Sequence, residues 1–193
     1  MTKFFIGGLI FALAIATAQS QTGAIHAATA QADADKVPSL PSDEEIGELL
    51  DKATEYVQAY QRTFTNAKHT LDEAPTPGFL DKANQLCTQA TTAISAIKKN
   101  GPSAFALVSL IAVLDDMSLN AARASSMSMI VGMREDKGDS ANHAIQDFQD
   151  LAQAEKNCYD ISELILHATL RYIAVEENAL SRIFASQKES TPK

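Results

Sequence analysis

The sequence predicts an all-α protein: an antiparallel four-helix bundle that follows a signal peptide and a disordered tether. Two observations favour this fold. Apolar residues recur at steps of three and four through four long segments, and proline or glycine separates these segments. No stretch shows the alternation of apolar and polar residues that is typical of a half-buried strand. The expected divisions are a signal peptide at 1–18, a linker at 19–41, the bundle at 42–187 and a disordered tail at 188–193.

The first 18 residues have the organisation of a secretory signal peptide. Lys3 precedes an apolar run from Phe4 to Ala16, and Ala16-Thr17-Ala18 supplies small residues at the cleavage position. The run of about 13 residues is too short to span a membrane, which needs roughly 20. A second possible cleavage region lies near 26–30. We therefore expect a secreted or periplasmic protein with no stable membrane insertion after cleavage.

Composition and motifs narrow the classes of function. Acidic residues number 24 and basic residues 16, which gives a net charge of −8. Because binding to phosphate backbones needs a cationic surface, we expect no nucleic-acid partner. The chain contains no Gly-x-Ser-x-Gly, no phosphate-binding loop and no His-Glu-x-x-His. These observations favour a binding protein over an enzyme.

The first helix has the clearest pattern. Ser42 and Glu45 form the sequence of a capping box behind Pro41, so a helix is expected to begin there. Its apolar positions alternate steps of four and three, and the prolines and glycine at 75–78 end the helix. The predicted seam consists of Ile46, Leu50, Ala53, Val57, Tyr60, Phe64, Ala67 and Leu71.

The next two helices are bounded by glycine and proline. The second is expected to start near Pro77 and to stop at Asn100, before Gly101. The third is expected from Ser103 to about residue 133. Because residues 104–114 are apolar apart from one serine, we expect this helix to be the most buried.

The fourth segment, residues 140–187, contains neither proline nor glycine. As one helix it would be roughly 70 Å long, against about 45 Å for the first helix. It must therefore extend past its neighbours or break. Asp160 and Glu163 offer a second helix start. We expect one continuous path with a kink at 156–160, and a fifth helix is the alternative.

The two cysteines, Cys87 and Cys158, both lie on apolar columns. Because an exported chain meets an oxidising compartment, we expect them to form a disulfide. In a square bundle the second and fourth helices are diagonal, and a disulfide allows only about 7 Å between Cα atoms. The disulfide therefore requires a distorted bundle or a broken fourth segment, and two separate buried thiols are the alternative.

A small set of residues is the candidate ligand site. Met127, Met129 and Met133 follow one another on the third helix, and Tyr56 and Tyr60 form an aromatic stripe on the first. Thioethers bind Cu(I) and methionine surfaces adapt to apolar ligands. Packing in the core is the alternative for both groups.

No metal centre or other cofactor is expected. Two helical pairs combine a histidine with a carboxylate, but zinc needs three or four ligands; the pairs are His143–Asp147 and Glu163–His167. The sequence thus predicts a helical-bundle binding protein without catalytic activity, with another protein as its partner. The alternative is a carrier of a small apolar ligand or Cu(I) that uses the methionine-rich third helix.

Overall fold

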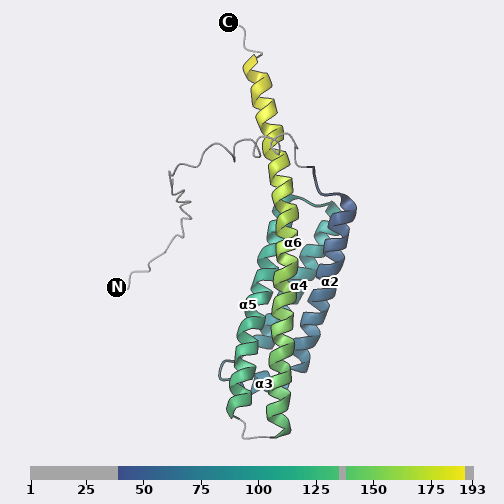
Figure 1. Cartoon of the computed structure of the whole chain (residues 1–193). Helices are drawn as coiled ribbons and strands as arrows, with labels where there is room; N and C mark the ends of the chain where they lie inside the picture. Colours follow the sequence, from purple (N-terminus) through teal and green to yellow (C-terminus); the bar gives the residue numbers. More distant parts are fainter. Residues whose placement is uncertain (1–38, 135–137, 190–193) are drawn as a thin grey trace, which may run out of the picture. The chain divides into compact units, whose positions relative to one another are not determined.

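The structure is a computed structural model. It describes residues 39–134 and 138–189, and side chains in the last helix as far as Ser181. The predicted signal peptide, most of the linker and the last residues of the tail lie outside the described residues. The described part contains no strand and consists of α2 (Asp43–Asn66), α3 (Lys68–Asp72), α4 (Phe79–Asn100), α5 (Ala104–Arg134) and α6 (Asp139–Glu189) (Figure 1). The prediction of an all-α fold is confirmed.

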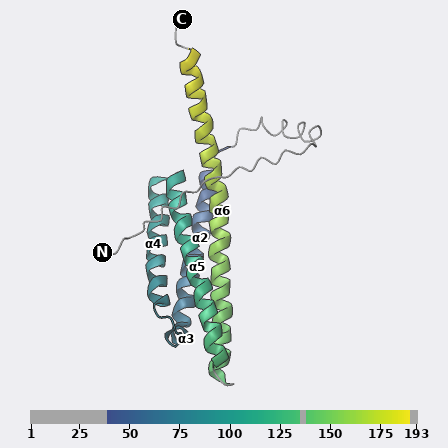
Figure 2. The ribbon, with the colours of Figure 1, turned by 90° about the vertical axis from the view of Figure 1, so that its left-hand side faces the viewer.

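The four long helices alternate in direction and form a square. Each pairs with the next along the chain, and α2 also pairs with α6, which closes the square. Among the described residues, no Cα atom of α4 comes within 8 Å of a Cα atom of α6. Helices α4 and α6 are therefore diagonal, and Figure 2 shows them on opposite sides of the bundle. This is the up-down-up-down topology of a four-helix bundle.

Helix α2 begins where the capping sequence predicts. The Ser42 Oγ accepts a hydrogen bond from the backbone N–H of Glu45 at 3.1 Å. The Glu45 carboxylate does not return to the cap, and instead accepts a hydrogen bond from Arg171 Nη1 at 2.6 Å. The start of α2 is thereby joined to α6, and this contact marks the end of the bundle along α6.

The first predicted helix is divided at Ala67, and its last turn forms the short helix α3. Its seam nevertheless continues across the division, because Ala67 and Leu71 are as well buried as the residues of α2. All eight predicted seam residues are buried. The pattern of steps therefore identified the buried side correctly although the helix ends earlier.

Helix α4 starts two residues after Pro77, behind Gly78, and stops at Asn100 as predicted. Gly101 follows with a φ of 84°, and its N–H donates to the Ile97 carbonyl at 2.9 Å. Glycine adopts this backbone region without the strain that a side chain would cause. The turn that reverses the chain toward α5 thus depends on Gly101.

The last segment is one helix of 51 residues, against 24 in α2. No second helix starts at Asp160, so the fifth helix of the fold is α3 rather than a part of the last segment. Because α6 is so much longer than its neighbours, its C-terminal part projects past the ends of α2, α4 and α5 (Figures 1 and 2).

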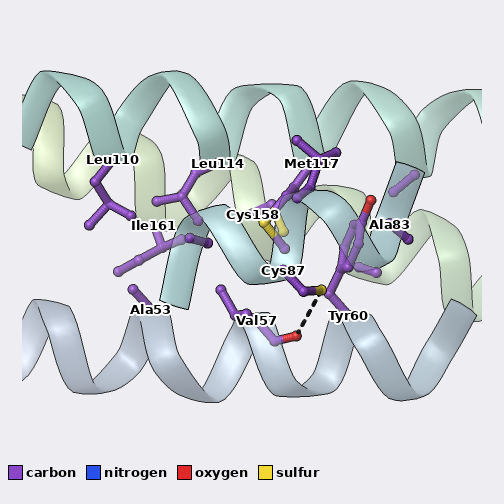
Figure 3. Packing of buried hydrophobic residues seen from close by; sticks show 14 of the residues in the cluster. Ala53, Val57, Tyr60, Ala83, Cys87, Leu110, Leu114, Met117, Cys158 and Ile161 are labelled. Atoms are coloured by element: carbon purple, nitrogen blue, oxygen red, sulfur yellow. Dashed lines mark hydrogen bonds between the residues drawn. The ribbon is translucent and has the colours of Figure 1, made fainter. Parts of the chain in front are cut away.

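The predicted disulfide is wrong. Cys87 and Cys158 are both buried and both free. Figure 3 shows the two side chains inside the core, where the Cys87 thiol donates to the Val57 carbonyl at 3.8 Å. Their helices are diagonal and their Cα atoms lie more than 8 Å apart, beyond the roughly 7 Å that a disulfide permits. The apolar columns showed correctly that both residues face the core. They did not show that α4 and α6 are diagonal, which places the two cysteines too far apart to form a disulfide.

Candidate functional site

Helix α5 is apolar on two opposite sides. Its inner side packs in the core through Leu107, Leu110 and Leu114. Its outer side carries Phe105, which is 84% exposed, and Leu119, which is 49% exposed. By length and composition α5 resembles a membrane span, with a mean hydropathy of 1.5 over 18 residues, of which 33% are buried.

Helix α5 contains ten buried residues, against six in α2 and seven in α4, so the prediction that it is the most buried helix describes its inner side but not its outer side. In a square bundle every helix presents one side to the core and one to solvent, so a helix that is apolar all round must expose part of its apolar surface. A soluble bundle needs no apolar residues on that outer side. The composition of α5 is thus unexplained by the core alone.

Helix α6 adds further apolar side chains beside the outer side of α5. The two helices are held close at Gly132, where an added Cβ would lie 3.3 Å from the Cβ of Ala144. Counting antiparallel from this contact at 1.5 Å per residue places Phe105 and Val108 level with about residues 168–171 of α6. Leu166 and Leu170 are exposed at this level.

We call this side of the α5–α6 pair the outer face. Its large members are exposed apolar side chains from both helices: Phe105, Val108, Leu119, Met129, Met133, Ile145, Tyr159, Leu166, Leu170 and Ile173. The face therefore runs along most of α5 and continues on α6.

An apolar hollow of about 270 Å³ opens near the end of α5. It is lined by Met129, Gly132, Met133, Ile145, Phe148 and Gln149. Met133 is 68% exposed and Ile145 is half exposed, so the lining is accessible from outside. The hollow lies at the opposite end of α5 from Phe105.

The structure separates the five predicted ligand residues. Met129 and Met133 line the hollow, whereas Met127 is half-buried and packs against the core. Tyr60 is fully buried, with its ring centroid 4.6 Å from that of Phe64, and its hydroxyl accepts a hydrogen bond from Asn120 Nδ2 at 2.9 Å. Tyr56 is half-buried beside Lys52. The two tyrosines therefore belong to core packing and not to a site shared with the methionines.

Charged side chains interrupt the middle of the outer face. Asp115, Asp116 and Arg123 are exposed around Leu119. Within the described part of the chain, none of these three forms an ion pair within 4.0 Å. Tyr159 of α6 donates a hydrogen bond to Glu163 Oε1 at 2.9 Å.

The pKa of Tyr159 is raised, chiefly by its hydrogen bond to the Glu163 carboxylate and more weakly by the charge of Asp115. Counted antiparallel from the contact between Gly132 and Ala144, Asp115 is level with about residue 161 of α6, so Tyr159 lies beside the exposed side of α5.

The buried thiols are poor nucleophiles. Burial raises the pKa of Cys87 to about 11 and that of Cys158 to about 12. Both therefore remain protonated at neutral pH, and the thiolate is the reactive form. Over residues 39–134 and 138–181, no three histidine, cysteine or carboxylate side chains gather as a metal site.

A second groove, of about 340 Å³, lies between α2 and α6 and has both charged and apolar side chains in its lining. Its lining includes Glu45, Glu48, Lys52, His167 and Arg171. Because Glu45 and Arg171 already pair with each other across it, this groove serves to join the two helices.

Apart from Met129 and Met133, the residues of the outer face were missed as a site by sequence reasoning. A signal for them exists, since Phe105, Val108, Ala112 and Leu119 repeat at steps of three, four and seven, offset from the buried seam of the same helix. Within an almost uniformly apolar run, two such stripes are difficult to separate.

Searches of protein-family models, curated proteins and solved structures give no match to this chain.

Proposed function

We propose that this protein is an exported interaction module that binds a protein partner through the outer face and catalyses no reaction. The observation that carries the proposal is that large apolar side chains are exposed along one side of the α5–α6 pair, on a helix whose core side is already satisfied. Extended exposed apolar patches on soluble proteins mark interaction sites.

The shape of the outer face suits a helical partner better than a small ligand. Binding sites for small molecules are concave and enclose about 300–1,000 Å³. The hollow, at about 270 Å³, is smaller than this and opens outward. The rest of the face is a stripe with helical spacing, which is the pattern that lies against another helix.

Export is a separate component of the proposal. It rests on the single early lysine, the apolar run and the small residues of Ala16-Thr17-Ala18. An exported binding module meets its partners outside the cytoplasm, and N-terminal sequencing that finds Gln19 as the first residue would support this component. Retention of Met1 would contradict it.

Site-specific photo-crosslinking in the exported fraction tests the binding face. A photoreactive residue is placed at Val108 or Leu166 on the outer face, and a matched one at Gln89 on the polar side of α4. We expect protein adducts at the first two positions and none at Gln89. Equal adducts at all three positions, or none anywhere, would contradict the proposal.

A second candidate function is supported by the two thioethers in the hollow. Met129 and Met133 could hold a small apolar ligand or Cu(I) there. Native mass spectrometry of protein from the exported fraction would then show a retained ligand or metal. Replacing both methionines by leucine keeps the apolar lining, so Cu(I) should be lost while an apolar ligand is retained.

A further inference from the structure

We propose that the outer face binds a second copy of this chain, so that two α5 helices pack antiparallel about a two-fold axis at Leu119. The inference rests on the proposed function, because it names the partner of the same face. A two-fold dimer uses the same surface on both copies, and this surface must therefore be complementary to itself.

The charges of the outer face meet this requirement. In an antiparallel pair centred on Leu119, a residue that precedes Leu119 by a given number of positions in one copy faces the residue that follows Leu119 by the same number in the other copy. Asp115 lies four residues before Leu119 and Arg123 four residues after it. Asp115 of each copy therefore meets Arg123 of the other, and both side chains are exposed and unpaired among the described residues of the single chain.

Two further pairs of the stripe match in size and polarity. Seven residues from the axis, Ala112 meets Ser126, so two small residues allow the helices to approach. Fourteen residues from the axis, Phe105 meets Met133, and both are strongly exposed in the single chain. Apolar side chains therefore face each other at the two ends of the helix pair, and acidic side chains face basic ones near its centre.

Helix α6 completes the contact. Leu166 and Leu170 lie level with the Phe105 end of α5, and this end faces the hollow of the second copy. The hollow lies beside Met133 and is lined by apolar side chains of α5 and α6. The exposed leucines of one copy would thus cover the hollow of the other, and the symmetry repeats this contact twice.

A lipid surface fits the same face less well. Asp115, Asp116 and Arg123 lie in its middle, where a membrane would have to accept three charges. The net charge of −8 also opposes binding to anionic lipid. The positions of Asp115 and Arg123, four residues either side of Leu119, favour a second copy, because a two-fold contact pairs acid with base there, whereas an unrelated partner could pair with them at any spacing.

Cysteine crosslinking tests the axis, with the full chain recovered from the exported fraction at about 0.15 M salt, so that the net charge is screened. The native thiols are buried. We expect Leu119→Cys to form a covalent dimer on mild oxidation, and Gln89→Cys on α4 to form none. Phe105→Cys alone should also form none, since two such residues would be roughly 42 Å apart, whereas a mixture of Phe105→Cys and Met133→Cys chains should crosslink.

Charge exchange tests the pairing independently of folding. Asp115→Arg or Arg123→Asp alone should raise the dimer Kd by roughly tenfold or more, because like charges then meet twice. The double exchange should restore the dimer in analytical ultracentrifugation. Asp81→Arg on the polar side of α4 is the control and should leave the Kd unchanged.

Three results would overturn the inference. The first is a monomer at concentrations up to roughly 100 µM, well above the Kd of a specific interface. The second is self-crosslinking of Phe105→Cys, which would indicate a parallel pair. The third is flotation of a monomer with anionic vesicles. If the protein is a monomer but still gives adducts with a different protein at Val108, the second copy is not the partner and the proposed function stands. If the protein forms no dimer and gives no adducts, both the inference and the proposed function are overturned.

Discussion

Helices α4 and α5 are consecutive and antiparallel, and each places one side in the same core, yet their solvent sides differ. The exposed side of α4 is polar apart from Ala96, and it includes Asp81, Lys82, Asn84, Gln85, Thr88, Gln89, Thr92 and Ser95. The exposed side of α5 carries the large apolar side chains of Phe105, Val108, Leu119 and Met133 together with the charged Asp115, Asp116 and Arg123. The difference shows that the bundle can be built with a polar exterior, so the apolar exterior of α5 needs a reason outside the single chain.

The largest expected effect separates the two sides of α5. Leu114→Ala should lower the free energy of unfolding by about 2–5 kcal/mol, because it leaves a cavity in the core. Leu119→Ala should change it by less than about 0.5 kcal/mol in the monomer, since this side chain is half exposed. Urea unfolding at protein concentrations that keep the chain monomeric measures both. Equal losses would mean that the outer side of α5 is covered within one chain.

The sequence predicted the buried seams well. All eight positions of the first seam are buried, because polar residues separate them and leave one orientation for the helix. The end of α4 was also predicted correctly, since glycine followed by proline stops a helix for local reasons. Local and periodic signals were therefore sufficient for the core and for most helix bounds.

The outer face and the state of the cysteines could not be read in the same way. Residues 104–114 are apolar on every side, so their sequence does not say which stripe faces inward. The columns of Cys87 and Cys158 give their direction within each helix but not which helices are neighbours. That depends on how the four helices close into a square, which is a property of the whole chain.

The next prediction concerns the residue that determines which side of α5 faces the core. The buried Asn120 donates to the Tyr60 hydroxyl at 2.9 Å and to the Phe79 carbonyl at 3.3 Å. Asn120→Ala should cost about 1–3 kcal/mol, because it leaves these buried groups without a partner. Ser128→Ala is the matched control, since the Ser128 Oγ is buried without a hydrogen-bond partner in the described structure and its removal should not destabilise. A silent Asn120→Ala would show that apolar packing alone orients α5.

Alkaline pH should reveal the inward-facing thiols. The ordinary pKa of a cysteine is about 8.5, and burial raises those of Cys87 and Cys158 to about 11 and about 12. Above about pH 8.5 the native state therefore keeps thiol protons that the unfolded state releases. The contribution of the two protonated thiols to the free energy of unfolding is complete below about pH 8.5 and is lost as the pH rises toward 11–12. Burial of Tyr60 raises its pKa as well, and it acts in the same direction.

Urea unfolding of the wild type and of Cys158→Ala between pH 7 and pH 10.5 measures this effect. The variant should be less stable at pH 7, because it lacks a buried sulfur, but it should lose less further stability as the pH rises. Parallel losses in both proteins would show that the Cys158 thiol is not shielded from solvent in the native state.

The smallest expected effect is that of a reductant at neutral pH. A disulfide that closed a loop of about 70 residues would contribute roughly 4 kcal/mol, and its reduction would lower the Tm by several degrees. Because α4 and α6 are diagonal and both thiols are free, reduction should leave the Tm unchanged, and peptide mapping without reductant should recover Cys87 and Cys158 unlinked. A disulfide between them would require α4 and α6 to approach each other. The square arrangement determines which sides of α4 and α5 are exposed to solvent. A disulfide between Cys87 and Cys158 would show that the helices are arranged differently, and the comparison of these two sides would then lose its basis.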